Sequence, residues 1–90
     1  MAYNIFYHYD IPKDLSKIPG NIKKRIRKAI EQRLSEEPLK YGEPLKRSLH
    51  GYWKLRVGDF RVIFKIEKEN IVILKIGHRH DIYSKVDSRL

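Results

Sequence analysis

The chain lacks cysteine and long apolar runs, and each absence excludes a class of protein. Without cysteine there is no disulfide, no cysteine nucleophile and no zinc site built on thiolates. No apolar run approaches the roughly 20 residues that cross a bilayer. Residues 1–10 lack the basic-then-apolar order of a signal peptide. We therefore expect a cytoplasmic protein with no membrane partner.

Acidic residues are also scarce. Asp and Glu number 11 against 20 Lys and Arg, which gives a formal net charge of +9. So basic a domain typically binds the phosphates of RNA or DNA and less often an anionic membrane, although an acidic protein partner fits the same charge. The simplest alternative is a basic surface that contacts only solvent.

The length and composition predict a single domain over residues 1–90, because 90 residues that are 41% hydrophobic can bury one modest core. Residues 3–9 are rich in aromatic residues and predict a first strand. A short helix is expected next. Asp10 can cap its start and Pro12 fits its first turn, while the Pro19–Gly20 pair ends it.

A longer amphipathic helix follows, with Asn21 as its expected cap and Pro38 as its expected end. Its apolar stripe has helical spacing and comprises Ile22, Ile26, Ala29, Ile30 and Leu34. Its other faces carry Lys23, Lys24, Arg25, Arg27, Lys28 and Arg33. We interpret most of these cations as a solvated face; contacts with RNA phosphates or an acidic partner are the alternative.

After a connection over residues 39–50, apolar and polar residues alternate with the period of a β-strand. The alternation covers residues 52–57, 60–66 and 71–76, which predicts a three-strand antiparallel meander. In the third strand, one face is expected to hold Val72, Leu74 and Ile76, and the other Ile71, Ile73 and Lys75.

Two turns connect these strands. Gly58–Asp59 has the signature of a type II′ hairpin turn. The second turn is expected within residues 67–70, where Asn70 tolerates the left-handed conformation. The predicted fold class is α+β: an N-terminal strand, a two-helix hairpin and a three-strand antiparallel meander, forming one twisted sheet with helices on one face.

The first turn determines which residues of the hairpin face each other. A two-residue turn places Arg56 opposite Arg61, and these two share with Lys54 the face that points away from the helices. Directly opposed arginines repel each other. The arrangement therefore favours an anion site over an ordinary exposed sheet face. Lys75 is expected on the same face, with Arg79 just beyond it.

The aromatic residues and histidines fall into separate groups. The expected core aromatics are Trp53, Phe60 and Phe64. Tyr52 is expected to pack simply, whereas Tyr83 is a candidate to stack on an RNA base. His78 and His80 point the same way in a strand, but they lack an obvious third ligand, so no metal site is expected.

Three stretches resemble the RelE/ParE superfamily of toxins from toxin–antitoxin systems. These are Leu45–Lys46, residues 51–64 (GYWKLRVGDFRVIF) and residues 76–83 (IGHRHDIY). The expected order of one strand, two helices and three strands is also similar, so the resemblance covers nearly the whole chain. RelE-like members of the superfamily are ribosome-dependent mRNA endonucleases. ParE-like members poison DNA gyrase and lack the basic catalytic set.

The resemblance implies a role for each matching residue. Lys54 matches the general-base lysine, and Arg56 a basic position beside it. Arg61 matches the arginine that stabilises the transition state. Arg79 matches the proposed general acid, although a guanidinium donates protons poorly, so we expect it to stabilise the leaving oxygen. Tyr83 matches the tyrosine that orients the nucleotide.

The implied reaction is attack of a ribose 2′-OH on the adjacent phosphate, without metal or cofactor. The implied partners are an acidic RelB-like antitoxin, mRNA on the ribosome, and 16S and 23S rRNA. Lys46, Arg47 and Lys75 are expected to supply further RNA contacts. Two alternatives are a ParE-like gyrase inhibitor that cuts nothing, and a family member that only binds RNA or its partner. The basic set favours the endonuclease, because a gyrase inhibitor does not need it.

Overall fold

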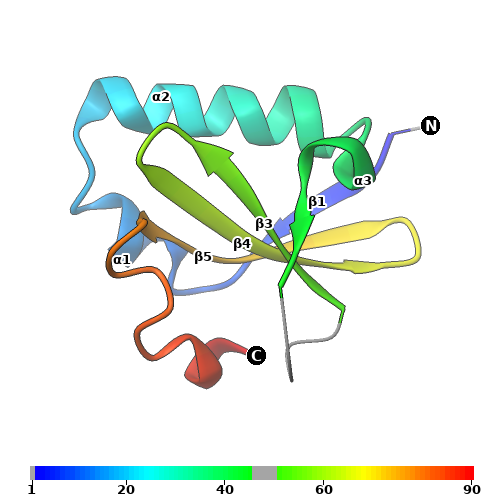
Figure 1. Ribbon diagram of the computed structural model, residues 1–90. Helices are drawn as coiled ribbons and strands as arrows, with labels where there is room; N and C mark the ends of the chain where they lie inside the picture. The colour runs from blue at the N-terminus through cyan, green and yellow to red at the C-terminus, as the bar shows by residue number, and fades with distance from the viewer. Residues whose placement is uncertain (1, 46–50) are drawn as a thin grey trace.

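A five-stranded sheet organises the computed structural model, which describes residues 2–45 and 51–90 (Figure 1). The strands are β1 (Asn4–Tyr7), β2 (Glu43–Pro44), β3 (Tyr52–Val57), β4 (Phe60–Glu67) and β5 (Asn70–His78). Their order across the sheet is β1-β5-β4-β3-β2, with β1 parallel to β5 and the other neighbours antiparallel. The predicted α+β class and the β3–β4–β5 meander are confirmed, and β2 is an additional short strand within the expected connection.

The helical elements are α1 (Ile11–Leu15), α2 (Gly20–Ala29), the π-helical turn η1 (Ile30–Leu34), α3 (Pro38–Tyr41) and the 3₁₀ turn η2 (Val86–Arg89). Two predicted boundaries are wrong. Asn21 lies inside α2, because the carbonyl of Pro19 already accepts hydrogen bonds from Ile22 and Lys23. Pro38 begins α3, since its fixed φ suits a first helical turn, and the preceding helix ends at η1.

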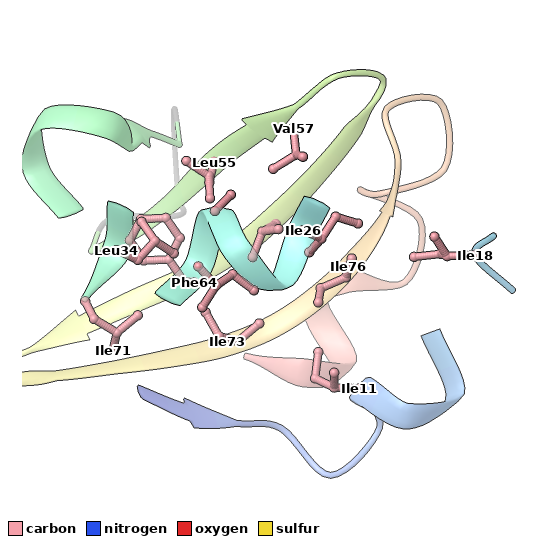
Figure 2. Close-up of a cluster of buried hydrophobic side chains, with 13 residues drawn as sticks. Ile11, Ile18, Ile26, Leu34, Leu55, Val57, Phe64, Ile71, Ile73 and Ile76 are labelled. Carbon is pink, nitrogen blue, oxygen red and sulfur yellow. The ribbon is translucent and has the colours of Figure 1, made fainter. Parts of the chain in front are cut away.

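The main core lies between α2 and one face of the sheet (Figures 1 and 2). The predicted helix stripe is confirmed: four of its members are buried, namely Ile26, Ala29, Ile30 and Leu34, while Ile22 packs at the margin. The sheet contributes Leu55, Val57, Val62, Phe64, Ile71, Ile73 and Ile76. Trp53 and Phe60 pack against this cluster, as predicted, and Phe64 is a fully buried member of it, near Leu34 in Figure 2.

A β-bulge changes the alternation in β5. Ile63 pairs with Lys75, but Phe64 pairs with Ile73, which leaves Leu74 as an extra residue. Because one extra residue reverses the faces that follow it, Ile73 and Ile76 both face the main core. Ile76 therefore lies on the face predicted for it. Val72 and Leu74 do not: they lie on the face opposite the main core, and Ile71 and Ile73 take the core face instead.

The bulge also helps to build a second, smaller cluster on the opposite face. Ile63 and Leu74 are buried there by Ile82 and Val86 of the C-terminal segment, which runs below the sheet in Figure 1. Tyr52 packs against this cluster, as predicted. The opposite face is thus partly apolar, and its cations are confined to the parts that the C-terminal segment leaves open.

A largely buried ion pair, with both side chains at least 10% exposed, holds the C-terminal segment against α1. Arg89 donates two hydrogen bonds to Asp14, from Nη1 to Oδ2 at 2.5 Å and from Nη2 to Oδ1 at 2.9 Å. Asp14 Oδ2 also accepts the backbone N–H of Ile76 at 3.0 Å. The hydrogen bond to Asp14 raises the pKa of Arg89. One carboxylate therefore connects α1, β5 and η2.

The two hairpin turns differ in how well the sequence predicts them. Gly58 has a φ of +60°, as a type II′ turn requires at its first central residue. In the second turn the left-handed residue is Lys68, with a φ of +57°, and not Asn70, which begins β5.

Among the described residues, no helix is both long and apolar enough to cross a membrane.

Candidate functional site

The β3–β4 hairpin has the predicted register. Arg56 pairs with Arg61, between the flanking pairs Leu55–Val62 and Val57–Phe60. Lys54 pairs with Ile63 and so shares the face of the two arginines. The turn chemistry and the strand period alone were sufficient to place these three cations on one face.

Arg61 folds back over the turn that precedes it. Its Nη1 donates to the carbonyl oxygen of Gly58 at 2.8 Å and to that of Phe60 at 2.9 Å. These bonds occupy one nitrogen of the guanidinium and fix its position. Its remaining N–H groups are available to an anion at the turn.

Arg56 makes an ion pair that the sequence did not reveal. Its Nε lies 2.9 Å from Glu43 Oε2 on β2, but the contact lacks hydrogen-bond geometry. Both side chains are substantially exposed, at 62% and 45%, and exposed ion pairs contribute only about 0–1 kcal/mol. Glu43 Oε2 itself is buried, however, so a phosphate bound by Arg56 has to compensate for the loss of this contact.

Arg79 reaches the same turn from the end of β5. Its backbone N–H donates to the carbonyl oxygen of Asp59 at 2.8 Å, and its Nε lies 3.9 Å from Asp59 Oδ1. Arg56, Arg61 and Arg79 thus all lie at the β3–β4 turn.

The structure adds Arg25 of α2 to this group. A Cβ built on Gly58 would lie 3.6 Å from Arg25 Nη2, so the guanidinium lies over the turn. Figure 1 shows the β3–β4 turn reaching up to α2. In the sequence, Arg25 is one of six cations on the helix, most of which are expected to face solvent. Only the packing of α2 on the sheet singles it out.

Lys75 and Tyr83 lie in a different environment. Lys75 faces the same side as Ile63, as predicted, but its Nζ donates to the carbonyl oxygen of Ser84 in the C-terminal segment. Burial lowers the pKa of Lys75, and the positive charge of Arg89 lowers it further. Tyr83 is 46% exposed and makes no side-chain hydrogen bond to the turn arginines within the described residues. Lys46 and Arg47 lie outside the described residues.

The two histidines stack on each other beside the turn. Their ring centroids are 4.9 Å apart, and the backbone N–H of His80 donates to His78 Nδ1 at 3.2 Å. The ring of His78 also contacts the ring of Phe60, in an edge-to-face arrangement. The described residues contain no group of three His, Cys, Asp or Glu side chains that could hold a metal ion.

This fold also occurs in known toxins. The family described as "ParE toxin of type II toxin-antitoxin system, parDE" matches residues 5–83. Toxin RelG of Mycobacterium tuberculosis is 36% identical over 87 residues, covering 94% of this chain and all of RelG. Toxin RelE3 of Methanocaldococcus jannaschii is 34% identical over 74 residues, which are 79% of this chain and 84% of RelE3.

A solved structure agrees with these relatives. The toxin–antitoxin complex RelBE2 from Mycobacterium tuberculosis contains a chain that superimposes with a TM-score of 0.82 at 32% identity, covering 88% of this chain and all of that one. The fold and these relatives identify a small basic toxin of the RelE/ParE superfamily. The chain belongs to the ParE toxin family of type II toxin–antitoxin systems.

Proposed function

We propose that this toxin is a metal-independent endoribonuclease that cuts mRNA in the A site of the ribosome. The observation that carries the proposal is the convergence of Arg56, Arg61 and Arg79 at one turn, with Lys54 on the same face as the first two. Two relatives with RelE-type names, RelG and RelE3, support it as well.

The proposed reaction is an attack by a ribose 2′-oxygen on the adjacent phosphorus. The bond to the 5′-oxygen of the next nucleotide breaks, which leaves a 2′,3′-cyclic phosphate and a 5′-hydroxyl. Lys54 takes the proton of the 2′-OH. The transition state carries additional negative charge on its phosphoryl oxygens, which Arg56 and Arg61 stabilise. Removing one such donor typically costs about 3 kcal/mol, or roughly a hundredfold in rate.

The remaining candidates act around this centre. Arg79 stabilises the negative charge on the leaving 5′-oxygen, which takes its proton from water to become the 5′-hydroxyl. Tyr83 orients a nucleotide base by stacking, which its exposure permits. Lys46, Arg47 and Lys75 contact the RNA backbone.

The proposed partners follow from the same chemistry. An acidic RelB-like antitoxin would neutralise a toxin whose net charge is +9, and the RelBE2 chain was solved in a toxin–antitoxin complex. The ribosome would supply the mRNA and contacts with 16S and 23S rRNA. We accordingly place the activity in the cytoplasm.

The first test is growth arrest after induced expression. Wild type is expected to stop growth, and Arg61→Ala is expected to relieve the arrest, because it loses about a hundredfold in rate. Arg27→Ala is a matched control: Arg27 is an exposed arginine on α2 that pairs with Glu31. It is expected to remain toxic. Full toxicity of a folded Arg61→Ala variant would refute the catalytic role.

Gyrase inhibition is the competing outcome. In that case induced cells would show inhibited DNA supercoiling while their mRNA stays intact. We expect the reverse, with cut mRNA and unchanged supercoiling.

A further inference from the structure

A basic groove runs along α2, next to the candidate site. It lies between α2 with η1 on one side and the end of β3 on the other, and encloses about 410 Å³. Arg25, Lys28, Arg33 and Arg56 line it, together with Gln32 and Gly58. No acidic residue is among its lining residues. The lining therefore presents four cations to whatever enters.

The groove is open because β3 is an edge strand at this end. β2 pairs with β3 only at Trp53 and Lys54. Beyond Lys54 no strand of the described chain covers the outer edge of β3. An extended chain can therefore lie beside this edge and contact α2 at the same time.

The cations of the groove have little local compensation. Arg25 and Lys28 have no carboxylate within 4.0 Å in the described chain. Arg33 lies over the ring of Tyr41, 5.5 Å from its centroid. Of the four groove cations, Arg56 alone has an acidic partner among the described residues, namely Glu43. Folding thus holds like charges together, and a polyanion would relieve their repulsion.

The groove is continuous with the candidate catalytic turn through Gly58. The Arg25 guanidinium lies over Gly58 on the groove side. The carbonyl oxygen of the same residue accepts the hydrogen bond from Arg61. Arg56 lines the groove and pairs with Arg61 across the hairpin. A chain bound at Arg61 can therefore continue past Arg56 toward Lys28.

We propose that this groove binds the phosphodiester backbone of the RNA strand beyond the nucleotide that is cut, with Arg25 and Lys28 contacting successive phosphates. This inference rests on the proposed function, because it assumes that the strand enters from the Arg61 side. It assigns Arg25 and Lys28 as RNA-binding residues, a role distinct from that of the solvated helix cations.

An RNA backbone fits this groove better than an acidic protein segment does. Protein segments need apolar anchors in addition to charge, and the groove offers only Ala29 and Val57. The opposite side of α2 has a larger groove of about 720 Å³ that is rich in apolar residues, including Ile11, Leu15 and Ile30. The two sides of the helix thus differ in chemistry, and the cationic side suits phosphate.

The test compares two double variants that each remove two cations from α2. The groove variant is Arg25→Gln with Lys28→Gln. The control variant is Lys23→Gln with Lys24→Gln, which removes the same charge from the apolar groove on the other side. All four side chains are exposed, so both variants should fold; urea unfolding checks this. The probe is a single-stranded oligonucleotide of about twelve 2′-O-methyl nucleotides, which cannot be cut, and its binding is followed by fluorescence anisotropy at several salt concentrations.

The groove variant should lose two phosphate contacts. For single strands each contact contributes about 0.7 to the slope of log affinity against log salt, so the slope should fall by about 1.4. At about 0.1 M salt this corresponds to roughly a 25-fold weaker affinity. The control variant should keep the wild-type slope. An equal fall in both variants would contradict the inference, since only overall charge would then matter.

Other outcomes separate this inference from the proposed function. If the groove variant binds RNA like wild type while the wild-type toxin cuts mRNA, the groove inference fails and the proposed function stands. If the groove variant loses RNA binding but wild type cuts no mRNA, the groove binds RNA and the proposed function fails. If the groove variant loses affinity only for its antitoxin, the groove takes an acidic protein and the inference is overturned.

Discussion

Replacing Asp14 with alanine should destabilise the fold strongly, because one carboxylate serves three elements. The Asp14 and Arg89 side chains are only 10% and 11% exposed. Without Asp14, Arg89 keeps a carbonyl acceptor at Leu74 and a carboxylate at Asp10, 3.8 Å away. The N–H of Ile76 loses its acceptor. Breaking a buried pair by removing one partner costs about 3–5 kcal/mol.

The fallback contacts of Arg89 reduce that cost. We expect Asp14→Ala to lower the free energy of unfolding by about 2–3 kcal/mol. A domain of this size loses about 4–8 °C of Tm for each kcal/mol, so the Tm should fall by roughly 10–20 °C. Asp14→Asn keeps an acceptor for Ile76 and should cost less. Combining Asp14→Ala with Arg89→Met should be less damaging than the sum of the single changes, because the charge left unpaired is also removed.

Urea unfolding of the four variants measures these differences. A loss below about 0.5 kcal/mol for Asp14→Ala, the scale of an ordinary surface substitution, would show that the Asp14–Arg89 pair does not hold the C-terminal segment. Additive single changes in the double variant would show that the two side chains do not interact.

Substitutions at Gly42 and Gly58 test the core packing and the β3–β4 turn, with Gly20→Ala as a control. Gly42→Ala should cost about 1–3 kcal/mol, since its Cβ would lie 2.7 Å from Phe64 Cζ and 2.7 Å from the carbonyl oxygen of Pro38; Gly20→Ala has open space and should leave the urea midpoint unchanged or raise it. A midpoint for Gly42→Ala equal to that of Gly20→Ala would refute the predicted clash. Gly58→Ala should cost about 1–2 kcal/mol, because its φ is +60° while its Cβ would meet Arg25 only at ordinary contact distance. It should also slow mRNA cleavage, since the turn positions the arginines; an unchanged urea midpoint would show that the turn relaxes without strain.

The sequence predicts the β3–β4 hairpin well because local rules determine it. A two-residue turn with Gly58 and an unbroken alternation leave a single register, which puts Arg56 opposite Arg61. The helix stripe of α2 is predictable for a similar reason, as its apolar period is regular.

The features that the sequence does not predict depend on tertiary contacts. Residues 71–74 are all apolar, so either face can be buried, and the bulge at Leu74 follows from the two clusters on opposite faces. β2 is only Glu43–Pro44, which is too short for an alternation of apolar and polar residues to be recognised in the sequence. The ion pair of Glu43 with Arg56 therefore cannot be predicted. Arg25 resembles its neighbouring cations until α2 packs beside Gly58. The face of the site can thus be predicted, whereas its charge balance cannot.

The most direct test of the central claim is a map of mRNA 5′ ends after brief induction of the wild-type toxin, with Arg61→Ala as the control. We predict new ends in register with codons, each carrying a 5′-hydroxyl, and a cyclic phosphate on the upstream fragment. The Arg61→Ala map should resemble that of uninduced cells. Growth arrest of wild-type cells with intact mRNA would contradict the claim that the arginines at this turn cut RNA.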